Sequence, residues 1–140
     1  MSQENVELAK RGYAVLNEVV KSGDFAALRR YVEERFDPAC VLKPAGELPE
    51  SAEVQGHEAA VRFLVAQSEA FDALWFEPVE FVDAADRVVV TVRVCGYGRH
   101  SGIKVEFLRG HVFSYRGGRV LRVDMYADRA DAFTAVGLEE

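Results

Sequence analysis

The sequence lacks the features that mark several common protein classes. It has only two cysteines, Cys40 and Cys95, which lie far apart and outside any Cys-x-x-Cys spacing. This predicts two buried thiols in a reducing compartment and argues against a disulfide or a metal site. No apolar run approaches the roughly 20 residues that span a bilayer, and residues 1–5 do not resemble a signal peptide. We therefore expect a cytoplasmic protein that does not enter a membrane.

An excess of positive charge is also missing. The 140 residues include 17 Lys and Arg against 23 Asp and Glu, which gives a net charge of −6. Nucleic-acid binding needs a basic surface, so nucleic acid is not an expected partner. The sequence has no metal-ligand cluster, phosphate-binding loop or Ser-His-Asp set, so neither a metal nor a cofactor is expected. Hydrophobic residues make up 49% of the chain, which predicts one folded domain over residues 1–140.

The hydrophobic pattern changes from helical to extended about halfway along the chain. In the first half apolar residues recur every three or four positions, and in the second half valine-rich runs alternate with turns. Helices and strands that are segregated in this way predict an α+β fold, with helices packed on one face of a curved antiparallel sheet and a short C-terminal helix. The predicted helices cover about residues 6–20, 24–35, 57–71 and 128–138, and the strands cover about 39–43, 75–82, 87–97, 105–115 and 119–127.

The strand predicted at 105–115 has an unusual face. Side chains alternate across a strand, so its odd positions share one side. Two basic residues, Arg109 and His111, lie in the middle of that apolar row. Basic groups in such a place must pair with an acid, face a wet cavity or lie at an interface. The row consists of Val105, Phe107, Arg109, His111, Phe113 and Tyr115.

The order of elements and the turns between them resemble the nuclear transport factor 2-like superfamily, and within it the SnoaL-like and ketosteroid-isomerase-like domains. The resemblance implies a cone, in which three N-terminal helices pack in a strongly curved antiparallel sheet around a deep, mostly apolar pocket. It also implies a homodimer through the outer sheet face. The matching segments are Gly23-Asp24, Pro44, Gln55-Gly56-His57-Glu58, Asp86-Arg87-Val88-Val89-Val90, Ser101-Gly102, Gly117-Gly118-Arg119-Val120, Tyr126-Ala127-Asp128 and Val136-Gly137-Leu138.

Carried over position by position, the resemblance implies which residues meet in the pocket. Lys43 stands where ketosteroid isomerases have an aspartate base, and His111 stands where they have a second acid. Limonene-epoxide-hydrolase-like members match at Arg109, but His111 and Met125 replace their two aspartates. Neither of these reactions is therefore expected. The implied polar groups are Lys43, Arg109 and His111, and the implied ligand-binding wall comprises Tyr13, Val41, Phe63, Phe107, Val123, Met125 and Ala127.

This basic set favours a small apolar ligand that is anionic or bears a carbonyl group. One hypothesis is an isomerase, cyclase or hydrolase that needs no cofactor, with His111 as acid or base and Arg109 or Lys43 stabilising negative charge. The alternative is a ligand-binding or dimeric interaction module without catalysis. Structural interpretations also stay open: His111 as a satisfied core residue, Lys43 directed to solvent, and Arg109 paired with Glu77, Glu80 or Glu106.

Overall fold

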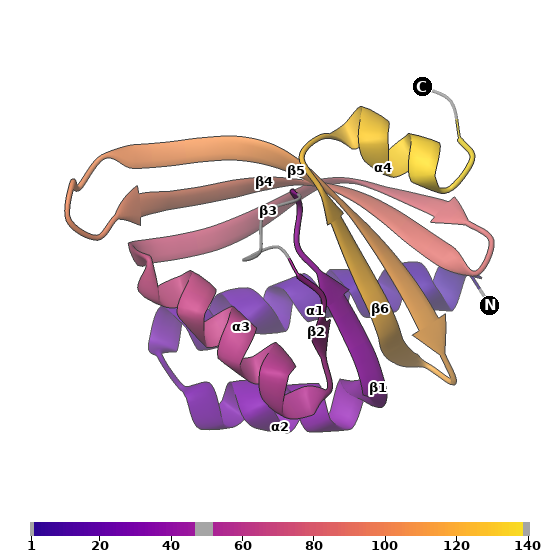
Figure 1. The fold of residues 1–140 in the computed structure, drawn as a ribbon, viewed down its shortest axis with the longest axis horizontal. Helices are drawn as coiled ribbons and strands as arrows, with labels where there is room; N and C mark the ends of the chain where they lie inside the picture. Colours follow the sequence, from indigo (N-terminus) through magenta and orange to yellow (C-terminus); the bar gives the residue numbers. More distant parts are fainter. Residues whose placement is uncertain (1, 47–51, 139–140) are drawn as a thin grey trace.

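The computed structural model describes residues 2–46 and 52–138. Along this part of the chain, helices come first and long strands follow (Figure 1). The elements are α1 (Ser2–Ser22), α2 (Phe25–Arg35), β1 (Phe36–Lys43), β2 (Val54–Gln55), α3 (His57–Glu69), β3 (Phe71–Ala84), β4 (Arg87–Gly98), β5 (Lys104–Arg116), β6 (Arg119–Tyr126) and α4 (Arg129–Ala135).

The strands form one curved sheet in the order β2-β1-β6-β5-β4-β3. Helices α1, α2 and α3 lie on its concave side, and α4 lies on the opposite face (Figure 1). The predicted α+β class is thereby confirmed. One pair departs from the antiparallel expectation, because β1 runs parallel to β6. The two strands are separated in sequence by α3 and the β3–β5 meander, and so long a connection permits the parallel arrangement.

Local chemistry explains where several elements begin and end. The Asp24 side chain accepts a hydrogen bond from the backbone N–H of Ala27 at 3.0 Å, which caps α2 as its position before the helix predicts. Strand β1 begins at Phe36, three residues earlier than predicted, and its pairing with β6 is irregular between Phe36 and Val41. This irregular stretch contains Pro38, which has no N–H to contribute to a regular ladder.

The second difference lies at the end of α3. The sequence pattern predicted that Phe71 continues this helix, but Phe71 pairs with Gly98 and opens β3. The aromatic ring fits the helical spacing of the apolar residues before it. Periodicity alone therefore did not separate the last turn of the helix from the first residue of the strand.

Strand β4 is buried on both faces and contributes to the hydrophobic core on each side of the sheet. Its inward valines pack against the apolar stripe of α1, and its outward Val89 packs against Val112 and the buried face of α4. The approach of α4 is close at Gly110, where a Cβ would lie 2.6 Å from the Cβ of Ala132. The inward set is Val88, Val90, Val92 and Val94, which contacts Val6, Ala9 and Tyr13.

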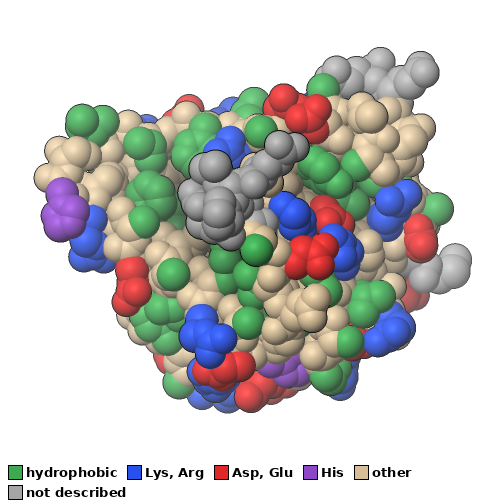
Figure 2. Space-filling view, in the orientation of Figure 1, with side chains coloured by type: hydrophobic (Ala, Val, Ile, Leu, Met, Phe, Trp, Pro, Cys, Tyr) green, Lys and Arg blue, Asp and Glu red, His purple; other side chains and the backbone are tan. Residues whose placement is uncertain are grey.

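On the face shown in Figure 2, basic and acidic side chains are interspersed among apolar ones. Many charged side chains of the described residues pair with one another: Arg122, for example, lies 2.7 Å from a Glu53 carboxylate oxygen and 2.9 Å from one of Asp124. Among the described residues, no helix has the length and apolar character needed to span a membrane.

Candidate functional site

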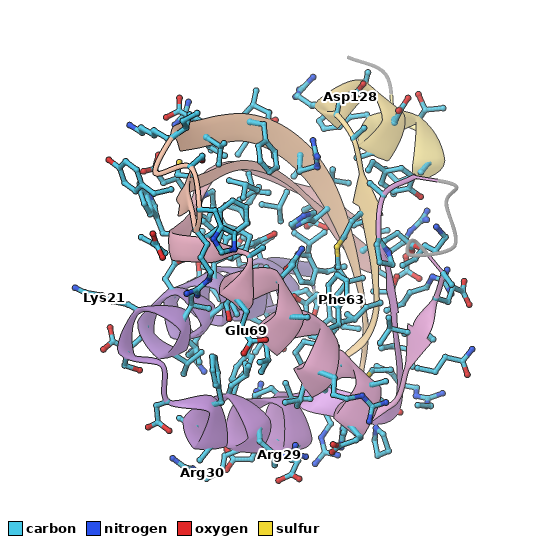
Figure 3. All side chains as sticks on the ribbon, turned by 60° about the vertical axis from the view of Figure 1, so that its left-hand side comes forward. Lys21, Arg29, Arg30, Phe63, Glu69 and Asp128 are labelled. Atoms are coloured by element: carbon cyan, nitrogen blue, oxygen red, sulfur yellow. The ribbon has the colours of Figure 1, made fainter. Side chains whose placement is uncertain are left out.

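A cavity of about 310 Å³ lies between the three N-terminal helices and the concave face of the sheet. Its wall is mostly apolar and aromatic, which is typical of small-molecule sites. Phe63 is on the side of α3 that faces the sheet (Figure 3) and forms part of this wall. The cavity volume is at the lower end of the range for ligand sites, so it suits a molecule of modest size.

Strand β5 contributes the central strip of the cavity wall. Its alternating residues from Phe107 to Tyr115 all line the cavity, as the period-two pattern predicts. His111 lies in register between Val90 of β4 and Met125 of β6, so the strands on either side present apolar side chains to it. The five β5 residues are Phe107, Arg109, His111, Phe113 and Tyr115.

His111 is hydrogen-bonded to a tyrosine from α1. Its Nδ1 lies 2.8 Å from the Tyr13 hydroxyl, and the two rings are stacked 6.1 Å apart at 10°. Burial, together with the nearby positive charge of Arg109, lowers the pKa of His111 to about 4. His111 is therefore neutral at pH 7. No described residue bonds to its Nε2, which leaves that nitrogen available to a molecule in the cavity.

Arg109 is a cation without a carboxylate partner among the described residues. Its guanidinium donates to the backbone oxygens of Leu108 and Ala127 at 3.3 and 3.4 Å and lies 4.3 Å from the centre of the Phe107 ring. The acids considered as partners bind other cations: Glu77 and Glu106 are paired with Arg93, and Glu80 is paired with Arg129. The interpretation of Arg109 as a member of an ion pair with these acids is wrong.

The other polar side chains of the described lining are tyrosine hydroxyls and the amide of Gln67. No Asp or Glu occurs among the described residues that line the cavity. Tyr31 and Tyr115 also line it, and burial raises the pKa of both phenols. The Tyr115 hydroxyl is buried without a hydrogen-bond partner in the described structure. The described lining therefore offers hydrogen-bond donors, but no carboxylate to balance a positive charge.

The structure brings together most of the predicted site residues. Tyr13, Phe63, Phe107, Val123 and Met125 line the cavity together with Arg109 and His111. Their roles in binding or catalysis stay predictions.

Three predicted residues, Lys43, Val41 and Ala127, lie outside the cavity lining. In β1 the register pairs Leu42 with the inward-facing Val123, so Leu42 takes the inner position and its two neighbours face away. Lys43 donates from Nζ to the backbone oxygens of Pro44 and Gly46 at 3.0 and 3.3 Å. Ala127 is exposed just after the end of β6. Its place on the pocket wall was a wrong prediction: Ala127 has the parity of Val123 and Met125, but β6 ends one residue before it, at Tyr126.

Sequence reasoning missed the contribution of α2 and of the chain that follows it. Tyr31 and Phe36 line the cavity, with their ring centres 6.0 Å apart and the rings at 73° to each other. Gly12 of α1 gives Tyr31 room, since a Cβ there would lie 2.8 Å from the Tyr31 hydroxyl. The available signal was the inward position of Tyr31 on the apolar face of its helix.

Comparisons with known proteins agree on the architecture. The sequence pattern of the SnoaL-like domain family matches residues 11–123. No curated protein is significantly similar in sequence.

Solved structures share the fold at low sequence identity. A candidate SnoaL-like polyketide cyclase from Jannaschia Sp. CCS1 superposes with a TM-score of 0.71 at 22% identity, over 99% of this chain and 94% of that one. A candidate polyketide cyclase from Sinorhizobium meliloti gives 0.62 at 25%, over 89% and 98%. A protein with a ketosteroid isomerase-like fold from Catenulispora acidiphila DSM 44928, in complex with trimethylamine, gives 0.66 at 12%, over 89% and 91%.

Proposed function

Because the chain belongs to the SnoaL-like domain family, we propose that its cavity binds a small, largely apolar molecule bearing a carboxylate or carbonyl oxygen. The observation that carries this proposal is Arg109, a cation on an aromatic cavity wall with no carboxylate partner among the described residues. Its present contacts are two backbone oxygens at 3.3 and 3.4 Å. A guanidinium binds a carboxylate through two parallel hydrogen bonds that are stronger than such neutral contacts.

The surroundings of Arg109 favour an anion further. The described lining has no acid that would repel a carboxylate, and its aromatic side chains provide an apolar surface for the body of the ligand. His111 is neutral at pH 7, so the positive charge is concentrated at Arg109. The ligand oxygen is accordingly placed near β5, and the apolar body extends toward α2 and α3.

A calorimetric titration at pH 7.5 with 2-naphthoate and 2-naphthamide tests this proposal, because the two probes share a shape and differ in charge. We expect the carboxylate to bind at least about tenfold more tightly, which corresponds to about 1.4 kcal/mol. Arg109→Gln should remove that preference. Arg93→Gln is the matched control, since Arg93 belongs to the same sheet but pairs with Glu77 outside the cavity. Equal affinity for the two probes in the unaltered protein would refute the charge preference.

A second candidate function is proton transfer next to a carbonyl, as in an isomerase or cyclase. The observation that favours it is the Tyr13–His111 hydrogen bond, which orients a neutral imidazole with Nε2 unpartnered. Nε2 would accept a proton from the carbon beside the carbonyl, and Arg109 would stabilise the resulting enolate oxygen. The names of two structural neighbours as candidate polyketide cyclases are consistent with this chemistry.

Enolisation is measurable without knowing the natural substrate. In deuterated water, exchange of the α-hydrogens of 2-tetralone is followed by NMR, with and without the protein. We expect acceleration that depends on His111 and disappears in His111→Gln while 2-tetralone still binds. If His111→Gln exchanges the α-hydrogens as fast as the unaltered protein, His111 is not the base.

A further inference from the structure

Two polar side chains of the cavity wall, His111 and Arg109, have hydrogen-bonding capacity that contacts within the described structure leave unused. His111 uses Nδ1 for the Tyr13 hydroxyl, and Nε2 has no partner among the described residues. Arg109 is two positions away on the same face of β5, about 7 Å along the strand. An anionic group located between these two side chains can contact both of them.

We propose that the cavity takes up one proton together with its organic anion, and that His111 holds this proton. The inference rests on the proposed function, since it concerns the same anion. The proton comes from solvent and converts the neutral imidazole to imidazolium, with no bond to carbon formed or broken. In the loaded cavity Nδ1–H donates to the Tyr13 oxygen and Nε2–H donates to the anion, which also contacts Arg109.

The groups around His111 explain why the proton enters only with the anion. The charged and titratable neighbours are Arg109 on its own strand and Tyr13 from α1, with Tyr115 and Tyr31 beyond Tyr13. None of these supplies a negative charge at neutral pH. The cross-strand neighbours from β4 and β6, Val90 and Met125, are apolar.

In the empty cavity, burial and Arg109 therefore hold the pKa of His111 to about 4. An anion at hydrogen-bonding distance from Nε2 opposes both effects. If it returns the pKa to the ordinary value of about 6.5, affinity rises about tenfold between pH 8 and pH 5.5. The direction follows because protons bind more tightly to the loaded state than to the empty one.

An aromatic sulfonate is the decisive probe, because it remains an anion throughout this pH range. We expect the affinity for 2-naphthalenesulfonate, measured by calorimetry, to rise about tenfold from pH 8 to pH 5.5. At pH 6 the binding enthalpy should depend on the ionisation enthalpy of the buffer, which reports proton uptake. His111→Gln keeps a neutral side-chain N–H and should make the affinity independent of pH. His100→Gln, in the exposed turn between β4 and β5, should behave like the unaltered protein.

NMR titration of the three histidine rings tests the same point in the unaltered protein, so the test does not depend on the folding of a variant. We expect one ring to titrate near pH 4 when the cavity is empty and near pH 6.5 when the sulfonate is bound. Binding that is constant from pH 8 to pH 5.5, with no histidine changing its titration, would overturn the inference and leave the proposed function intact. No sulfonate binding at any pH, together with no 2-naphthoate binding, would overturn the proposed function itself.

Discussion

Removal of one hydroxyl group should have opposite consequences at two tyrosines of the same cavity. Tyr13 is almost fully buried, and its hydroxyl lies 2.8 Å from Nδ1 of His111. The Tyr115 hydroxyl is buried and has no partner in the described structure. Substitution by phenylalanine leaves each ring in place, so Tyr13→Phe and Tyr115→Phe make the same chemical change in different hydrogen-bonding environments.

The expected magnitudes follow from these contacts. Tyr13→Phe removes a hydrogen bond and leaves the ring nitrogen of His111 unsatisfied, which costs about 1–3 kcal/mol. Tyr115→Phe removes a desolvated hydroxyl that gains nothing in return, so the free energy of unfolding should stay constant or rise by about 1 kcal/mol. The two variants should therefore differ by about 1–4 kcal/mol in free energy of unfolding, which is a large share of the stability of a small domain.

Urea denaturation at pH 7.5, where His111 is neutral, measures both free energies of unfolding under one set of conditions. A thermal scan should show the same order of stability. Two results would refute the reasoning: a loss of more than about 1 kcal/mol in Tyr115→Phe, or no loss in Tyr13→Phe. The first would mean that the Tyr115 hydroxyl has a partner, and the second that the Tyr13–His111 bond adds no net stability.

Three further predictions concern the free protein. In the folded protein the pKa of His111 is lowered to about 4 from an ordinary 6.5. The contribution of His111 to the free energy of unfolding should therefore be complete above pH 6.5 and should fall by up to about 3 kcal/mol as the pH drops to 4. In urea titrations across this range, the free energy of unfolding should change less with pH in His111→Gln than in the unaltered protein. Gly110→Ala should cost about 1–3 kcal/mol in the same assay, since the added methyl meets Ala132 and the backbone of Asp128 at 2.6 and 2.7 Å. The expected homodimer predicts a solution mass of about twice 15.6 kDa by sedimentation, and Leu108→Lys, at a side chain that is 48% exposed, should lower it.

The sequence was most informative where a pattern was long. The alternation from Phe107 to Tyr115 predicted that these residues share one face of β5, because side chains alternate across a strand, and the family resemblance implied that this face lines a pocket. The helix start at Asp24 was also predictable, since its side chain satisfies a backbone donor within three residues. Both predictions depend on interactions that are local in the chain.

Predictions failed where the answer depended on distant partners. Leu42 is the inward residue of β1 because that strand pairs with β6, about 80 positions later in the chain. The residues around Lys43 carry no signal from which this register could be predicted. The pKa of His111 could not be predicted from the sequence either. Burial against α1 and the charge of Arg109 lower it to about 4. Neither effect is visible until the helix and the sheet are placed together.

The tight contact between α4 and Gly110 has a consequence for the opposite face of the sheet. If β5 slipped by one residue against its neighbours, Arg109 or His111 would move to the position under α4. A single methyl group already collides there with Ala132, so neither long side chain can be accommodated. Helix α4 thus restricts the register of β5 to the alignment in which Gly110 lies beneath the helix. A helix outside the cavity therefore determines which side chains of β5 face into the cavity.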